Sequence, residues 1–85
     1  MQTILDFTKE IVDEICKYKN EFTLTIMPDK IRIIDHYDED DWTVIRDITF
    51  SNDLFNVLTN YGGHVDNINE SQFKTIKEVV DFIFN

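Results

Sequence analysis

Residues 22–37 read FTLTIMPDKIRIIDHY, and this segment carries the first evidence for the architecture of the chain. Over 22–26, three apolar residues alternate with two threonines, which is the pattern of a strand with one buried face and one wet face. Proline presets φ at the first central position of a turn, so Pro28-Asp29 should reverse the chain direction. The segment therefore predicts two antiparallel strands, the second running over 30–37.

A third strand is predicted over 42–50, which carries the apolar residues Val44, Ile45, Ile48 and Phe50. The alternation is imperfect, because Ile33-Ile34 and Val44-Ile45 place apolar groups on both faces of the expected sheet. Apolar residues on both faces are expected where helices or a partner cover part of the second face.

The segment before the first strand predicts an amphipathic helix over 3–19, since its apolar residues recur at spacings of three and four. Thr3 can cap this helix, and Asp6 can return a bond to the Thr3 amide in the manner of a capping box. Several acids of this helix form a further negative edge, with Glu10 three and four positions from Asp13 and Glu14.

Two more helices are predicted after the third strand. Ser51 can cap one of them, and Gly62-Gly63 would end it, because glycine tolerates the left-handed conformation that follows a helix. Ser71, or Asn69 just before it, can open the last helix. The expected fold is α+β with two layers, a three-stranded antiparallel sheet with helices in the order α-β-β-β-α-α, in a single domain spanning 1–85.

Composition narrows the function classes. Seventeen acids against eight bases give a formal charge of −9, which argues against nucleic acid or an anionic bilayer as a direct ligand and favours basic partners. Cys16 is the only cysteine and falls in the apolar pattern of the first helix, so we expect a buried thiol and a reducing, cytoplasmic setting in a bacterial host cell. No run approaches ~18 apolar residues and no signal-peptide pattern follows Met1, so we expect no membrane association.

Four consecutive acids, Asp38 to Asp41, form the most informative functional feature, because adjacent carboxylates repel unless water or a cationic partner reaches them. Between Asp35 and Asp53, seven acids stand against one base, so most of the net charge is local. Trp42 follows the run and is either a core residue at the strand end or an exposed anchor in an acidic rim. The candidate partner-binding residues are Asp35, Asp38, Glu39, Asp40, Asp41, Trp42, Asp47 and Asp53. A solvated loop that only maintains solubility is the alternative interpretation.

Catalytic, metal and cofactor sites are not predicted. An EF-hand loop starting at Asp35 would require glycine where Asp40 stands and glutamate where Arg46 stands. Neither histidine has a second histidine or a cysteine at metal-binding spacing, and Cys16 lacks the setting of a reactive thiolate. With two adjacent glycines, the chain also has no glycine-rich phosphate loop. We therefore expect a protein that is not an enzyme, with no cofactor and no metal.

In size, acidity and expected order of elements, the chain resembles small phage proteins that mimic DNA. The nearest in architecture are type II-A anti-CRISPR inhibitors, which occupy the site of Cas9 that recognises the protospacer-adjacent motif, and phage inhibitors of uracil-DNA glycosylase are similar in size and charge. The resemblance implies an inhibitor that occupies a basic nucleic-acid-binding surface of another protein, with Asp38 to Asp41 in place of phosphates. Asp35, Asp47 and Asp53 would then be outer contacts. An immunity protein against a basic nuclease is a variant of the same hypothesis.

A structural or assembly module is the alternative from a different class. Residues 79–84, VVDFIF, carry more apolar groups than one helical face can bury, which a homodimer through the last helix would explain. The chain is thus expected to be a monomer or a homodimer. Salt distinguishes the two hypotheses, because a charge-driven complex weakens as salt rises whereas an apolar dimer holds or tightens.

Overall fold

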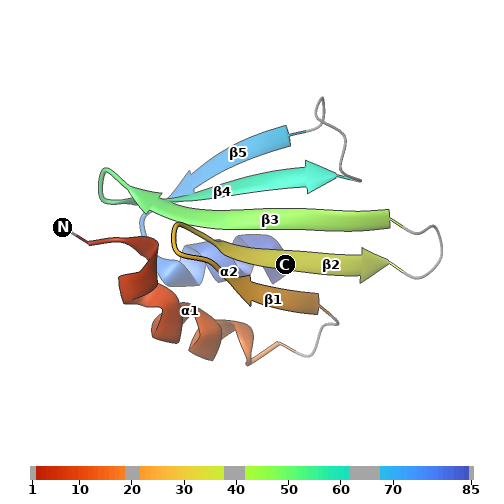
Figure 1. Ribbon diagram of the computed structural model, residues 1–85, viewed down its shortest axis with the longest axis horizontal. Coiled ribbons are helices and arrows are strands. Elements are labelled where there is room, and N and C mark those ends of the chain that lie inside the picture. The colour runs from red at the N-terminus through yellow and green to blue at the C-terminus, as the bar shows by residue number, and fades with distance from the viewer. Residues whose placement is uncertain (1, 19–21, 38–41, 62–67, 85) are drawn as a thin grey trace.

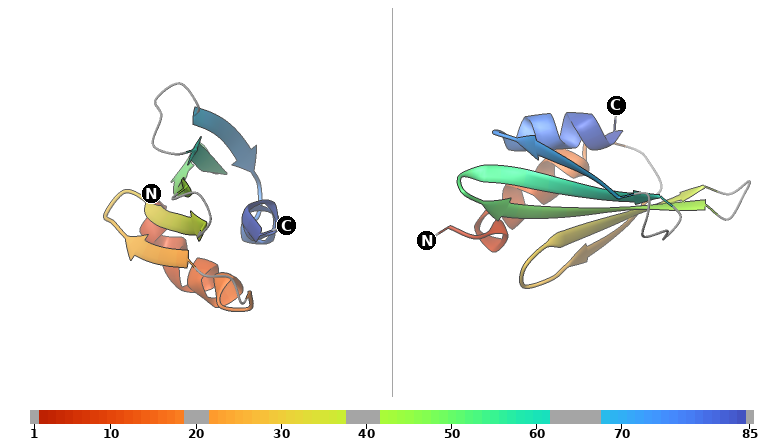
Figure 2. Two further views of the ribbon diagram at one scale, coloured as in Figure 1. Left: turned by 90° about the vertical axis from the view of Figure 1, so that its right-hand side faces the viewer. Right: turned by 90° about the horizontal axis from the view of Figure 1, so that it is seen from above.

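The computed structural model describes residues 2–18, 22–37, 42–61 and 68–84, and within them the chain forms one curved sheet with helices on one face (Figure 1). The elements are, in chain order, η1 (a 3-10 turn, Ile4–Phe7), α1 (Thr8–Ile15), β1 (Phe22–Ile26), β2 (Ile31–Tyr37), β3 (Trp42–Ser51), β4 (Leu54–Tyr61), β5 (Ile68–Phe73) and α2 (Ile76–Phe84). The five strands are antiparallel and follow one another across the sheet in chain order. Both helices lie on the same face of the sheet (Figure 2).

The α+β class is therefore right, but the predicted three-stranded sheet and the order α-β-β-β-α-α are wrong. The first error concerns β4, which was expected to be a helix capped by Ser51. Instead Ser51 pairs with Leu54 across a two-residue turn in which Asn52 and Asp53 have φ of 53° and 62°. Hairpins favour two-residue turns with positive φ at both positions, because their twist matches that of the flanking strands. Asn and Asp tolerate this conformation better than most residues, so this pair continues the sheet.

The second error concerns the last helix, which begins at Ile76 and not near Ser71. Thr75 caps it, because its Oγ1 accepts a hydrogen bond from the Glu78 amide at 3.2 Å. The Thr75 hydroxyl in turn donates to the Glu78 carboxylate at 3.2 Å. The residues expected to open the helix form β5 instead, with Ser71 opposite Val57 of β4.

The prediction of the N-terminal half is largely confirmed. The expected helix is present as η1 followed by α1, and the Thr3 amide donates to Asp6 Oδ2 at 2.8 Å, as the capping-box pattern predicted. The β1–β2 and β2–β3 hairpins are antiparallel. Cys16 departs from the expectation, because its position at the end of α1 leaves it exposed.

The core lies between the helices and one face of the sheet. Its buried apolar residues are Ile4, Ile11, Ile15, Ile31, Ile33, Ile48, Phe55, Val57, Val79, Val80 and Ile83. At one end, Phe7 of η1 packs on Phe50 and Phe55, with ring centroids 4.7 and 5.0 Å apart. At the other end, the ring of Tyr18 stacks on Phe84 at 4.9 Å. Fully burying each large aliphatic side chain stabilises the fold by about 1.5–3 kcal/mol, so this single layer of side chains holds helices and sheet together.

The turn between β3 and β4 provides a test of the corrected topology. Replacing Asp53 with glycine should raise the free energy of unfolding by about 0.5–1 kcal/mol, because glycine adopts positive φ without a Cβ clash and Asn-Gly is the preferred pair for this turn. Asp53→Ala is the matched control and should lower it by about 1 kcal/mol. Urea denaturation followed by circular dichroism measures both. A loss of stability in Asp53→Gly would contradict the hairpin turn.

Candidate acidic interface

The acidic run predicted as the centre of the site, Asp38 to Asp41, lies outside the described residues. The residues that flank it are placed, because Tyr37 at the end of β2 pairs with Trp42 at the start of β3. The side chain of Trp42 also lies outside what is described. The run therefore connects β2 and β3, as expected from the sequence.

Asp35 lies on the helix-facing side of β2 and is engaged within the fold. Its carboxylate accepts a hydrogen bond from the guanidinium of Arg46 on β3, and the two side chains are only 14% and 13% exposed. Thr59 of β4 is paired with Arg46 across the sheet and is 1% exposed. The Arg46 Nε and the Thr59 hydroxyl are buried without a hydrogen-bond partner in the described part of the chain. Asp35 therefore neutralises the guanidinium of Arg46, which is largely buried on the helix side of the sheet.

Asp47 lies on the opposite face and is engaged in the same way. Its two carboxylate oxygens accept bonds from Arg32 Nε at 2.8 Å and from an Arg32 terminal nitrogen at 3.1 Å. Lys30 Nζ lies 3.9 Å from the same carboxylate. The hydrogen bonds from Arg32, and then the charge of Asp47, raise the pKa of the guanidinium above its usual value. Asp47 thus ties β2 to β3 across their register and is not a free anion.

Asp53 is exposed in the turn between β3 and β4, at the end of β3 remote from the run. At about 3.4 Å per residue, the length of β3 separates Trp42 from Ser51 by roughly 30 Å. The structure does not bring Asp35, Asp47 and Asp53 together, since two lie on opposite faces in ion pairs and the third lies far along the sheet.

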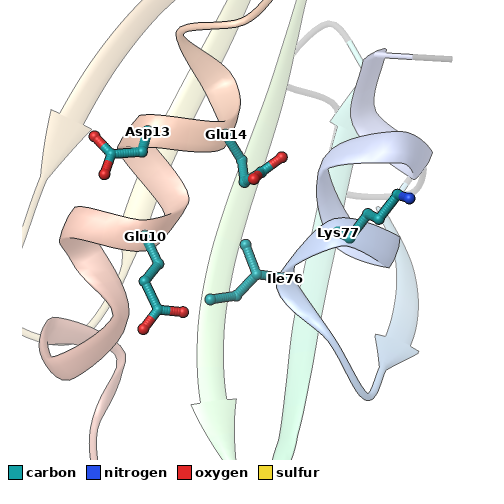
Figure 3. A pocket seen from close by; sticks show the side chains of 5 residues that line it. All are labelled: Glu10, Asp13, Glu14, Ile76 and Lys77. Carbon is teal, nitrogen blue, oxygen red and sulfur yellow. The ribbon is translucent and has the colours of Figure 1, made fainter.

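A second acidic surface lies on the helix layer, as the spacing of the α1 acids suggested. Glu10, Asp13 and Glu14 of α1 line a shallow groove with Ile76 and Lys77 of α2 (Figure 3). Glu14 accepts a hydrogen bond from Lys17 at 2.8 Å, and this bond is the main cause of the raised pKa of the Lys17 ammonium. No ion pair involves Glu10 or Asp13 among the described residues. These two carboxylates are therefore available to an external cation.

The last helix offers less apolar surface than its sequence implied. Val79, Val80 and Ile83 of α2 are buried in the core, and Phe84 stacks on Tyr18. Phe82 remains 43% exposed, beside Phe73 of β5 at 5.0 Å. Most of the apolar side chains of α2 that had suggested a dimer through this helix are therefore buried or packed within the chain itself.

Within the described residues, no helix is long and apolar enough to span a membrane. The same part of the chain contains no group of three histidine, cysteine or acidic side chains arranged to hold a metal ion. No protein-family model, curated protein or solved structure matches the chain. The functional argument therefore depends on the chain's own charges and surfaces.

The Asp35–Arg46 pair can be tested as a structural element. Asp35→Asn should lower the free energy of unfolding by about 3 kcal/mol, because it leaves a largely buried guanidinium without its counter-ion. The double variant Asp35→Leu with Arg46→Met should recover most of this loss, since apolar groups of similar volume replace the pair. Urea denaturation of both variants and of the exposed control Asp29→Asn measures the effect. A double variant no more stable than Asp35→Asn would show that the unpaired charge is not the cause.

Proposed function

We propose that this chain is a non-enzymatic inhibitor that binds a basic, nucleic-acid-binding surface of another protein and thereby competes with nucleic acid. The observation that carries the proposal is the way the chain distributes its charges. Lys30, Arg32 and Arg46, the cations of the β2–β3 hairpin, are all held in ion pairs with Asp35 or Asp47. Glu10 and Asp13 of α1 take part in no ion pair among the described residues, and the sequence places four further acids, Asp38 to Asp41, between β2 and β3.

Such a distribution suits a surface that replaces nucleic acid. Duplex DNA presents one negative charge per ~1.7 Å of its axis, and a protein that binds DNA offers lysines and arginines spaced to meet these phosphates. Four consecutive carboxylates joined to two paired strands provide a comparable local charge density on a rigid base. A basic cleft would attract this end of the protein at a high rate, and the affinity would fall as salt rises.

The proposal assigns different tasks to the acids around the run. Asp38, Glu39, Asp40 and Asp41 contact the partner in place of phosphates, with Trp42 beside them as an anchor. Asp35 and Asp47 do not contact the partner but stabilise the hairpin, because their ion pairs join β2 to β3. The nucleic-acid-binding enzymes of a bacterial host, including CRISPR effectors, are the class of partner that this chemistry suits.

The first test is a pull-down with the tagged chain from a low-GC bacterial lysate, at low and high salt, with and without competing duplex DNA. We expect recovery of a nucleic-acid-binding protein that is released both by duplex DNA and by high salt, since both compete for the same cations. Retained proteins are identified by mass spectrometry. Partners that neither salt nor DNA displaces would contradict the proposal and favour an assembly module.

Neutralising the run is the second test. Asp38→Asn, Glu39→Gln, Asp40→Asn and Asp41→Asn together should weaken binding of the recovered partner about 100-fold, if each exposed pair contributes about 0.5–1 kcal/mol. The matched control makes the same charge change at exposed acids outside the run: Glu10→Gln, Asp13→Asn, Asp29→Asn and Glu78→Gln.

The control set should retain most of the affinity, measured by calorimetric titration, because it lowers net charge without altering the run. Equal loss in both sets would show that total charge alone matters. Loss in the control set alone would move the contact surface away from the run, and either result would overturn the assignment of the run.

A further inference from the structure

The sheet has a second face, opposite both helices, that no described element covers (Figure 2). We call this the open face. Because side chains alternate along each strand, the residues adjacent to the buried ones point to it. Its large aliphatic residues are Ile34 on β2, Ile45 on β3, Leu54 and Leu58 on β4, and Ile68 on β5. Leu58 is 36% exposed and Ile68 48% exposed.

The register places four of these residues, Ile34, Ile45, Leu58 and Ile68, in two adjacent rows across the sheet. In one row, Ile34 lies opposite Ile45, Ile45 opposite Asn60, and Asn60 opposite Ile68. The next row continues from Asp47 to Leu58 and then to Glu70. These four aliphatic side chains therefore form one contiguous patch between charged groups, the arrangement typical of a contact surface with a polar rim.

The charges of the open face are separated along this second row. At the β2 side, Lys30 and Arg32 share a single carboxylate, that of Asp47, which leaves one positive charge in excess. At the β5 side, Glu70 is exposed and takes part in no ion pair among the described residues. Lys30, Arg32, Asp47 and Glu70 are thus neutral in sum, positive on the β2 side and negative on the β5 side, on a chain whose net charge is −9.

We propose that the open face binds a second copy of this chain, face to face, about a two-fold axis parallel to the strands. Such an axis through β3 places β2 of one copy over β4 of its partner, and β1 over β5. Lys30 and Arg32 of each copy then lie beside Glu70 of the other, and the aliphatic patches meet between the two charge contacts. An axis across the strands would instead place like charges over one another, so the charges favour the parallel axis.

Size and net charge define the strength and the salt dependence of this dimer. Five strands ~4.8 Å apart and about six residues long give a face of roughly 24 by 20 Å, which is below the ~800 Å² per partner of a standard stable interface. The dimer is therefore weak and reversible. Because two chains of charge −9 repel each other, screening salt strengthens their association. This dependence has the opposite sign to that of the charge-driven complex proposed above, so the two proposals can fail independently.

Sedimentation equilibrium of the intact chain tests the dimer, with loading concentrations from ~10 µM to ~1 mM and salt near 0.05 and 0.5 M. We expect the average mass to rise from 10.1 kDa toward twice that value with concentration, and to rise further at high salt. A monomer at every concentration and both salts would overturn the proposal.

Single substitutions locate the interface. Leu58→Asp should abolish association, because it places a carboxylate between Asp47 and Glu70 in the centre of the contact. Leu5→Asp is the matched control, since Leu5 is 47% exposed on η1, away from the open face, and should leave the dimer intact. Phe82→Ser tests α2 as the alternative surface. A dimer lost in Phe82→Ser but retained in Leu58→Asp would overturn the proposal, and circular dichroism verifies that each variant is folded.

A charge exchange tests the geometry. Lys30→Glu alone and Glu70→Lys alone should each weaken the dimer at low salt at least five-fold, because each places like charges at both edges of the contact. The double variant should bind within two-fold of the unaltered chain, since the two edges have only exchanged signs. Failure of the double variant to recover affinity would contradict the parallel axis.

Discussion

A five-stranded sheet has two faces, and the helices of this chain cover only one of them. α1 and α2 have eight and nine residues, and both pack on the side that carries the buried isoleucines. A strand residue can therefore be fully buried only if its side chain points to the helix side. This requirement determines the register of the strands. The other side must be made compatible with water by polar groups, by ion pairs or by association.

The ion pairs of the β2–β3 hairpin follow from the same constraint. Among the described cations of this hairpin, Arg46 is the one whose position in the alternation directs it to the helix side, where Asp35 neutralises it. Arg32 points to the open face and meets Asp47 directly across the strands. The hairpin thus pairs its three cations, Lys30, Arg32 and Arg46, with two of its own acids, Asp35 and Asp47. The distribution of charge in this protein therefore depends on the strand pairing as well as on the composition.

The sequence was sufficient for the first three strands because two independent signals agreed, the alternation over 22–26 and the Pro28-Asp29 turn. It was insufficient for β4 because Leu54, Val57, Leu58 and Tyr61 also have helical spacing, while the alternating set that is actually buried includes Thr59, a polar residue. The deciding feature was Asn52-Asp53, whose positive φ continues a hairpin. β5 is an edge strand with mostly exposed side chains, so it carries no apolar pattern and depends on its pairing with β4.

For the site, the sequence located the acids but not which of them were already paired. Once Tyr37 is paired with Trp42, the strand register places Arg32 directly opposite Asp47. The same register places Asp35 diagonally across from Arg46. The ion pairs could therefore have been predicted from the register of the hairpin. The open face could not be recognised, because the apolar residues on both sides of the strands had been expected to lie under helices or a partner.

The two proposed surfaces are compatible, and their combination has a physical consequence. A two-fold axis parallel to the strands leaves positions along the strands unchanged, so the Tyr37–Trp42 ends of β2 and β3 from both copies lie at the same end of the dimer. Two acidic runs would then face a basic partner together. A second contact made within one complex benefits from a high effective concentration, which increases affinity without any new kind of contact. Salt strengthens the dimer but weakens each charge contact with the partner. As salt rises, the affinity for the partner would therefore fall less steeply for a chain that dimerises than for two separate charge contacts.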